Sequence, residues 1–489
     1  MAAGSDPVEH AFDLNIGTVL EHWTVPFAIR EILANALDEQ ALSDTTEPVI
    51  SRDASGRWRI TDAGRGLRYE HLTQNESAEK RRHPDVIGQF GMGLKDALAV
   101  FDRRGIPVRI ASPHADITTA RRAKQDFPDV VTLHAIVTAA SNPDRVGTEV
   151  VLDQVDDADV AAAKRFFLHY SDERVLESTE YGEVLAAPPR GTPARIYVKG
   201  LLVAEEPNFL FSYNIRRLCA ALRRALNRER SNVGRGAYTD RVKAILTACR
   251  STDVAAPLTA DLAAFTSGRM HDELSWRDVA LHACRVLQTT TRVVFVTAAQ
   301  MAANTPQVTY AQADGYRIVV VPDAIARSLA AMTDLDGNPM TDLNAYRQAW
   351  NDSFAFNFVD PAAMTAAERT VHDRTRAIAA LVGTDLSQPT APVVLISETM
   401  RLNDTGYPVL GVWEPAHARI VIRRDQLTDL PSYAGTLLHE IGHLRSNTPD
   451  GTLAFERELT DLLGIVAATA LSATAPDDGH ATGVVSRPR

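Results

Sequence analysis

Apolar positions along the chain alternate between helical and strand spacing, which predicts a protein built from both kinds of element. Residues 23–40 carry an apolar stripe at helical spacing, with Pro26 in the first turn. Residues 48–61 have the pattern of a hairpin that turns at Ala54-Ser55-Gly56. Strand-like runs follow at 107–111, 130–138 and 147–152. We therefore expect an α/β (α+β) domain over residues 10–155.

The remaining pattern predicts two more regions of mixed type. A middle region, 156–385, has strand-like runs at 193–205, 293–296 and 318–321 and helical stretches at 213–287 and 363–383. A C-terminal α+β region, 386–472, has strands expected at 393–397, 408–413 and 418–423 and helices at 432–446 and 452–470. The tail, 473–489, is rich in Pro, Gly and Asp and is expected to be disordered.

Composition narrows the class of protein. The 489 residues include three cysteines, Cys219, Cys249 and Cys284, without a C-x-x-C pair, which argues against a disulfide framework. A net charge of -11 makes a nucleic-acid partner unlikely, although a local basic groove is not excluded. The start of the chain has no secretory pattern, and no apolar run has membrane-spanning length. We expect a cytoplasmic, bacterial protein with no membrane partner.

Three short motifs near the N-terminus carry chemistry. Glu31, Asn35 and Asp38 lie on one face of the first predicted helix. A D-x-G-x-G motif and a Gly-rich turn follow; their members are Asp62, Gly64, Gly66, Gly88, Gly91, Gly93, Leu94 and Lys95. A carboxylate after a strand can accept a hydrogen bond from a base amine, and a Gly-rich turn into a helix offers N–H groups to phosphates. An Asn oxygen can ligate Mg²⁺, and a nearby Glu can take a proton from water.

In this order the motifs resemble the GHKL superfamily of gyrase B, the ninety-kilodalton heat-shock chaperone, histidine kinases and MutL. The run Ile87–Gly93 is similar to the chaperone's phosphate loop, and Gly93-Leu94-Lys95 to the MORC group. Gly147-Thr148 is similar to the strand that closes the family's ATP site. The resemblance implies a Bergerat-type α/β sandwich that binds ATP and Mg²⁺. Asp62 and Thr148 would then bind adenine, Asn35 would hold magnesium, and Glu31 would be the general base.

The resemblance also implies a lid and a contact from the next domain. Residues 67–87 would be the ATP lid, and an ATP-dependent homodimer is an expected partner. Family members often recruit a basic residue to the γ-phosphate, for which 225–235 supplies Arg228, Arg230 and Arg235. A solvated basic helix end is the simpler interpretation and is preferred. If one of these arginines does contact the γ-phosphate, Arg228 and Arg230 are the candidates.

The C-terminal region contains an H-E-x-x-H motif. On a helix, His439 and His443 lie one turn apart and can bind one zinc ion, while Glu440 can act as general base toward zinc-bound water. The strand-like run Ala418–Arg424 precedes this helix, as the substrate-edge strand does in zincin peptidases. We therefore predict a catalytic zinc site.

The third zinc ligand is less determined, because position 449 is Pro and the metzincin pattern is absent. The acids that follow are Asp450, Glu456, Glu458 and Asp461. Glu456 is preferred since it stands in a Phe-Glu pair that leads into the last helix, as the ligand often does in compact gluzincin-like peptidases. Asp450 could instead orient a histidine.

The sequence thus favours an ATP-regulated zinc metallopeptidase that acts on a protein or peptide, with a role in bacterial stress or phage defence. The alternative is a chaperone-like or MORC-like ATPase with a structural, non-proteolytic zinc site. Structural zinc sites are mostly Cys-rich, which favours catalysis. A histidine kinase is disfavoured because no phospho-acceptor helix pair precedes the ATPase motifs.

Overall fold

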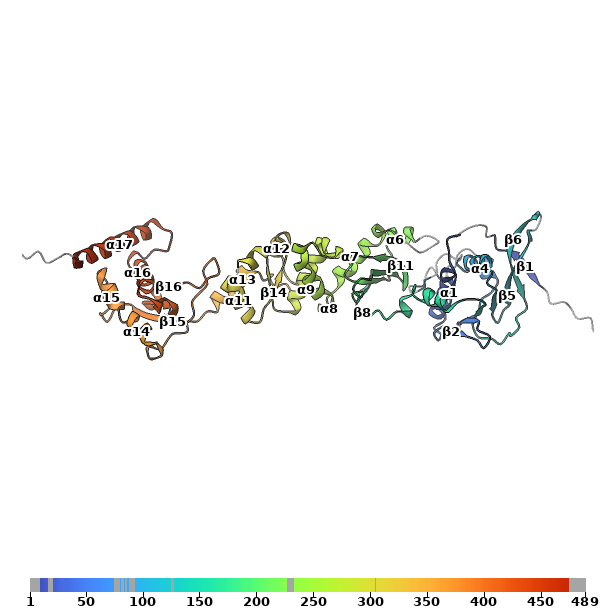
Figure 1. Ribbon diagram of the computed structural model, residues 1–489, viewed down its shortest axis with the longest axis horizontal. Helices are drawn as coiled ribbons and strands as arrows, with labels where there is room; N and C mark the ends of the chain where they lie inside the picture. The colour runs from blue at the N-terminus through green and yellow to red at the C-terminus, as the bar shows by residue number, and fades with distance from the viewer. Residues whose placement is uncertain are drawn as a thin grey trace, which may run out of the picture. The chain divides into compact units, whose positions relative to one another are not determined.

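The computed structural model describes residues 9–15, 21–73, 80, 83, 86–87, 93–124, 127–226, 233–303 and 305–474. Helices and several sheets occur along the whole described chain, so the predicted mixed α/β class is confirmed (Figure 1). The chain divides into two compact units, Met1–Thr290 with Arg327–Asn338, and Thr291–Ala326 with Pro339–Arg489. The four-part organisation expected from the sequence stays a prediction.

The first unit begins with a seven-stranded antiparallel sheet. Its strand order is β1-β6-β5-β4-β7-β3-β2. The strands are β1 (His10–Asp13), β2 (Val49–Arg52), β3 (Trp58–Thr61), β4 (Val108–Ala111), β5 (Asp116–Lys124), β6 (Phe127–Thr138) and β7 (Glu149–Leu152). Strand β5 was not expected, because its sequence DITTARRAK lacks an apolar alternation; pairing with β6 along its length supplies its backbone partners.

Helices cover this sheet and share one hydrophobic core with it. They are α1 (Val25–Ser43), α2 (Glu70–Thr73), α4 (Gly93–Arg103) and α5 (Asp157–Lys164). Ile29 and Leu33 of α1 pack with Phe101 of α4 and with Ile60 and Leu152 of the sheet. The apolar stripe that predicts α1 is therefore the face that packs into the core. The candidate nucleotide residues lie on another face of the same helix.

A five-stranded sheet follows in the same unit, in the order β11-β10-β12-β9-β8. Its strands are β8 (Val175–Ser178), β9 (Gly182–Leu185), β10 (Ala194–Val198), β11 (Leu201–Glu206) and β12 (Ser212–Ile215). The helices after it are α6 (Ala220–Ala225), α7 (Thr239–Ala248), α8 (Thr252–Leu262) and α9 (Arg277–Thr290). The helical stretch expected from 213 onward starts later, because Ser212–Ile215 is entirely buried between β10 and β9.

The second unit contains two small sheets. Strands β13 (Val293–Val296) and β14 (Arg317–Val320) pair in parallel. The helices near them in sequence are α10 (Ala298–Ala302), α11 (Pro306–Ala313), α12 (Asp323–Leu329) and α13 (Leu343–Asp352). The other sheet has the order β15-β17-β16, so β16 is an edge strand. Its strands are β15 (Val393–Ser397), β16 (Gly411–Glu414) and β17 (Arg419–Arg423).

Helices share a hydrophobic core with the three-stranded sheet. They are α14 (Ala366–His372), α15 (Thr375–Leu381), α16 (Leu430–Ser446) and α17 (Leu453–Thr474). Asp429 caps α16 by accepting the Ser432 N–H at 2.8 Å, and Asn447 ends it in the left-handed conformation. That reversal brings α17 back against α16. Residues 475–489, most of the expected tail, lie outside the described part of the chain.

None of the helices in the described residues is long and apolar enough to span a bilayer.

Candidate functional site

The inner face of α1 carries the first three candidate residues. Glu31 and Asp38 are buried, with exposed fractions of 3% and 1%, and Asn35 is half-buried. Arg30 donates from Nε and Nη2 to Oε1 of Glu31, at 3.0 and 2.7 Å. The Arg30 guanidinium is itself enclosed by the rings of Trp23, Phe27 and Phe166. Since a buried charge needs a partner, Arg30 holds the Glu31 carboxylate in place.

Lys80 joins this face from the segment expected to be the lid. Its Nζ lies 3.2 Å from Oδ1 of Asn35 and 3.0 Å from Oδ2 of Asp38. The backbone N–H of Ile87 donates to Oδ1 of Asp38 at 2.6 Å. The Asn35 amide oxygen therefore already faces a cation. Sequence reasoning missed Lys80 because a lysine in a polar loop carries no distinguishing pattern.

Asp62 and Thr148 come together although they are far apart in sequence. Oδ1 of Asp62 accepts the N–H groups of Gly64 at 2.9 Å and of Thr148 at 3.2 Å. The hydroxyl of Thr148 accepts the N–H of Leu67 at 2.9 Å. Burial raises the pKa of the Asp62 carboxyl, and the two backbone hydrogen bonds oppose this shift. A buried acceptor thus stands at the end of β3, as expected for a base-binding carboxylate.

Glycines allow the backbone to approach these carboxylates closely. A Cβ on Gly93 would lie 2.0 Å from Oε2 of Glu31, so the start of α4 is in contact with the candidate base. A Cβ on Gly147 would lie 1.9 Å from the carbonyl oxygen of Asp62. Gly64 and Gly66 form the turn that follows Asp62. Any larger side chain at Gly93 or Gly147 would move the groups that define the site.

The other residues expected at the phosphate end are only partly described. Leu94 and Lys95 lie in the first turn of α4, and Lys95 is buried. Gly88 and Gly91 lie outside the described residues, as do Arg228 and Arg230.

Two basic side chains of the following region differ in what they reach. Arg235 is described and forms ion pairs with Glu206, at 3.1 Å, and with Asp272, which leaves it engaged away from the candidate nucleotide residues. Lys199, in the turn between β10 and β11, points instead to the expected lid. Its Nζ lies 3.4 and 3.3 Å from the carbonyl oxygens of His83 and Val86. The sequence had not marked Lys199.

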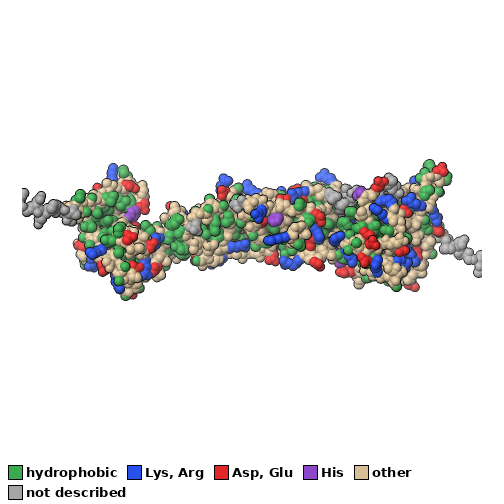
Figure 2. All heavy atoms as spheres, viewed as in Figure 1, with side chains coloured by type: hydrophobic (Ala, Val, Ile, Leu, Met, Phe, Trp, Pro, Cys, Tyr) green, Lys and Arg blue, Asp and Glu red, His purple; other side chains and the backbone are tan. Residues whose placement is uncertain are grey.

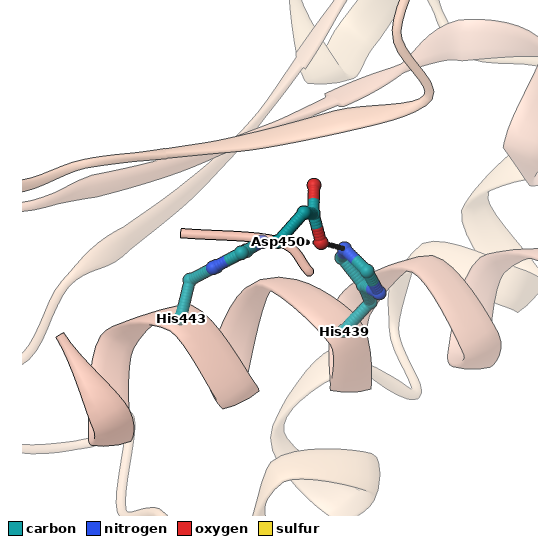
Figure 3. A group of neighbouring side chains, drawn as sticks. All are labelled: His439, His443 and Asp450. Atoms are coloured by element: carbon teal, nitrogen blue, oxygen red, sulfur yellow. Dashed lines mark ion pairs between the residues drawn. The ribbon is translucent and has the colours of Figure 1, made fainter. Parts of the chain in front are cut away.

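The H-E-x-x-H motif lies on α16 and forms a candidate metal centre. His439 and His443 extend from one face of the helix toward Asp450 in the loop that follows it (Figure 3). Nε2 of His439 and Nε2 of His443 lie 3.1 and 3.4 Å from Oδ1 of Asp450. One ligand atom from each residue lies within 4.8 Å of the others. This donor set of two imidazoles and one carboxylate is the chemistry that zinc prefers.

Second contacts orient both imidazoles. Nδ1 of His443 lies 2.8 Å from the carbonyl oxygen of Thr448, which leaves Nε2 facing Asp450. The Phe455 ring stacks on His443 at a centroid distance of 4.1 Å and meets His439 edge-on at 4.9 Å. Burial lowers the pKa of His439, and the Asp450 carboxylate opposes this shift, while the nearby His443 adds to it. The net lowering favours the neutral imidazole that a metal requires.

The structure puts Asp450, and not Glu456, beside the histidines. Phe455, Leu459 and Leu462 form the face of α17 that packs on α16, and Glu456 lies one residue around that helix, exposed. Glu458 pairs with Arg445 at 2.7 Å, and Asp461 is exposed. Asn447 is the sequence feature that could have indicated Asp450 as a ligand. It ends α16 in the left-handed conformation, and the chain then turns back over the histidines.

Glu440 lies on the adjacent face of α16, against the edge strand. It is only 4% exposed, and burial raises its pKa to about 7, although the backbone N–H of Trp413 donates to it. A Cβ on Gly411 would lie 2.8 Å from Oε1 of Glu440 and 2.8 Å from Cγ2 of Thr436. Gly411 therefore gives Glu440 the space that it occupies.

A cleft of about 850 Å³ contains this group. Its lining includes His439, Glu440, His443 and Asp450 together with Gly411 to Trp413 of β16. The strand beside the motif is thus β16 at Gly411–Glu414. The expectation that 418–424 is the edge strand is wrong, because β17 at Arg419–Arg423 is paired on both sides, with β15 and with β16.

Comparisons with known proteins match large parts of the chain. A family model described as the Mycoplasma pneumoniae MPN635 N-terminal domain matches residues 158–252. An uncharacterised protein of Mycoplasma pneumoniae (strain ATCC 29342 / M129 / Subtype 1) is 35% identical over 239 residues, which cover 48% of this chain and 95% of that protein.

Chaperones are also among the relatives. The chaperone protein HtpG of Methylobacterium sp. (strain 4-46) is 27% identical over 186 residues, 31% of this chain and 29% of HtpG. HtpG of Methylorubrum extorquens (strain PA1) is 28% identical over 197 residues, 32% of this chain and 30% of HtpG. The chain therefore matches less than a third of the length of these chaperones. None of these names refers to a peptidase, so the metal centre depends on its geometry alone.

Proposed function

The chain belongs to the family of the Mycoplasma pneumoniae protein to which it is 35% identical, and on that premise we propose that it is an ATP-hydrolysing protein of the GHKL type with a zinc-dependent peptidase site. The distant similarity to HtpG, a chaperone with a GHKL ATPase domain, supports the first activity. The His439–His443–Asp450 group beside Glu440 supports the second. Dimerisation driven by ATP stays an expectation from the resemblance.

In the proposed nucleotide site, each group of residues has a separate role in binding or hydrolysing ATP. Asp62 accepts a hydrogen bond from the adenine amine and Thr148 lies beside it. The two residues hold each other in place, because the Asp62 N–H donates to the Thr148 carbonyl and the Thr148 N–H donates to Oδ1 of Asp62. The start of α4 supplies N–H groups to the phosphates. Glu31, in contact with Gly93 at that start, takes the proton of the attacking water. Asn35 fits a magnesium ligand, because its oxygen already faces the Lys80 ammonium.

In the zinc site, the ligands would be His439, His443 and Asp450. A zinc ion held there supplies Lewis acidity, which activates water and polarises a peptide carbonyl. Glu440 takes the proton of the water and returns it to the leaving amine. Burial against β16 raises the pKa of the Glu440 carboxyl, which makes it a better proton acceptor. The edge strand β16 offers backbone groups that an extended substrate can pair with.

The open cleft is the observation that favours catalysis over a structural zinc site. Closed structural sites are mostly Cys-rich and surrounded by four protein ligands. Here the described group has three donors, the Asp450 side chain is 72% exposed, and a buried carboxyl stands beside it. On the face that Figure 2 shows, basic and acidic side chains are interspersed, which gives no support to a nucleic-acid substrate.

The deciding experiment compares the full chain with Glu440→Gln after both are loaded with zinc. Each is incubated with a peptide library, with and without ATP, and products are identified by mass spectrometry. Wild type should release products, while Glu440→Gln should retain zinc and release none. If wild type cleaves nothing although it binds zinc and hydrolyses ATP, the chain is a chaperone-like ATPase, the second candidate that the HtpG similarity favours.

A further inference from the structure

The free edge of β16 faces the metal cleft. The carbonyl of Leu410 accepts the N–H of Arg423 at 2.8 Å, so backbone groups at this register point to β17. Backbone direction alternates along an antiparallel strand, so Gly411 and Trp413 point to the other side. The Trp413 N–H does so, since it donates to Glu440. The backbone groups of Gly411 and the carbonyl of Trp413 can therefore pair with an extended peptide that lies over the metal centre.

This edge ends abruptly before Gly411. The N–H of Val409 donates to the carbonyl of Arg401 at 2.9 Å, and Leu402 bridges to Pro408. The hairpin formed by residues 401–409 thus occupies the position that the next residues of a bound peptide would need. A peptide that follows the edge from Trp413 past Gly411 meets the hairpin within a residue or two.

Arg401 stands at this closed end and lines the same cleft as the histidines. Its side chain is exposed, and its guanidinium makes no ion pair or side-chain hydrogen bond with any residue that the structure describes. The nearby Arg423 differs, because it is paired with Asp425 and with the carbonyl of Pro408. A guanidinium presents a fork of donors that matches a carboxylate.

The geometry points to a carboxypeptidase: the cleft binds the C-terminal end of a peptide, and Arg401 receives its free α-carboxylate. An antiparallel peptide on β16 runs from Trp413 toward Gly411, so its C-terminus arrives at Arg401. A parallel peptide would bring its ammonium group there instead, against a like charge. Hydrolysis breaks the C–N bond near the C-terminus; water gives its oxygen to the acyl carbon and a proton to the leaving amine.

This inference rests on the proposed peptidase function, and two peptides separate the two ideas. They share one sequence and differ only in a free acid or an amide at the C-terminus. The zinc-loaded full chain should remove one or a few residues from the acid at least about tenfold faster, the scale of one charge-assisted contact. Equal, internal cleavage of both would leave the peptidase function standing and overturn the carboxypeptidase.

Binding gives a readout that does not depend on turnover. Glu440→Gln should bind the fluorescently labelled acid peptide at least about tenfold more tightly than the amide, measured by anisotropy. If the wild type cleaves neither peptide, the peptidase function fails, and this binding difference alone decides whether Arg401 receives a carboxylate. Equal affinity for acid and amide overturns the inference.

Variants of Arg401 assign the preference to one side chain. Arg401→Gln should raise KM for the acid peptide, leave kcat and zinc content unchanged, and have no effect on the amide. Arg401→Lys should retain part of the preference, because it keeps the charge but loses the fork. Arg376→Gln, an exposed arginine on α15 that does not line the cleft, is the matched control. Equal loss on acid and amide would show that Arg401 has only a structural role.

Discussion

Arg30 and Glu31, consecutive residues of α1, form a buried ion pair in which the guanidinium donates two hydrogen bonds to one carboxylate oxygen, Oε1. The other oxygen, Oε2, is the one that a Cβ on Gly93 would meet, at the start of α4. One oxygen is therefore fixed by Arg30 while the other faces the helix end where we expect phosphates. This arrangement orients the carboxylate toward that helix end.

Replacing Glu31 tests its role in hydrolysis. Glu31→Ala should bind ATP with wild-type affinity but turn it over at least about 100-fold more slowly, because a general base contributes on that scale. Phosphate release and nucleotide affinity are measured on the same preparation. Glu47→Ala, at a side chain that is 72% exposed, should behave as wild type. Unchanged turnover in Glu31→Ala would place the base elsewhere.

Asp62→Asn should abolish ATP binding. The Asp62 carboxylate accepts two backbone N–H groups through Oδ1. An amide at this position can keep those bonds through its own oxygen, but it then presents an NH₂ donor to the adenine amine, which is also a donor. Calorimetry with ATP measures the effect, and Asp144→Asn in an exposed loop is the control. Wild-type affinity in Asp62→Asn would remove the GHKL assignment of this site.

Most of the fold could be predicted because the apolar pattern matches what the elements bury. Helix α1 and the strands β3, β7, β15 and β17 follow apolar stripes whose side chains are buried in hydrophobic cores. The polar strand β5 was missed, since its partner β6 and not its own pattern specifies it. Short motifs located both candidate sites, because Asp62-x-Gly64 and H-E-x-x-H need only local geometry.

The partners that depend on tertiary contacts were the ones that sequence could not supply. Lys80 and Lys199 reach their sites from loops with no distinguishing spacing. The choice between Glu456 and Asp450 as a ligand depends on which segment after α16 lies over the histidines. The left-handed conformation of Asn447 places the loop that contains Asp450 there. The edge strand was likewise predicted at 418–424, whereas the sheet order makes Gly411–Glu414 the edge. The sequence of a single strand does not show whether it is paired on one side or on both.

Zinc content tests the third ligand. The purified chain should bind about one zinc ion, and His439→Ala should lose it. Asp450→Asn should weaken zinc binding about tenfold or more, because it removes the charge that both histidines face. Glu456→Gln is the matched control and should bind zinc as wild type does. The reverse result, measured by metal analysis after dialysis, would restore Glu456 as the ligand.

Gly411→Ala should slow peptide cleavage about tenfold or more while zinc content stays the same. Its methyl group would lie 2.8 Å from Oε1 of Glu440 and must displace that carboxylate. Misplacement of a reacting group by about 1 Å can cost about 100-fold in rate. Gly435→Ala is an internal control, since Gly435 lines the same cleft and a Cβ there meets nothing within 4 Å. Equal rates for the two variants would contradict Glu440 as the base.

Communication between the nucleotide and the zinc site needs an element that both can bias. Lys199 provides a connection within the first unit, because its turn belongs to the β10–β11 hairpin while its ammonium contacts the carbonyls of His83 and Val86. The turn is fixed by Asn214, whose Oδ1 accepts the N–H of Gly200 at 2.8 Å. Lys199 therefore links His83 and Val86 to the hairpin of the five-stranded sheet.

We therefore expect a non-hydrolysable ATP analogue to change zinc-dependent cleavage several-fold, since a ligand shifts an equilibrium through its different affinity for the two states. Asn35→Ala should erase this response by losing Mg²⁺-ATP. Lys199→Ala should bind the analogue normally and yet lose the response, because only the connection is cut. Arg190→Ala, an exposed residue before β10, should respond as wild type does. If the cleavage rate is the same with no nucleotide, ATP and the analogue, the two sites work independently and Lys199 serves only to hold the segment it touches.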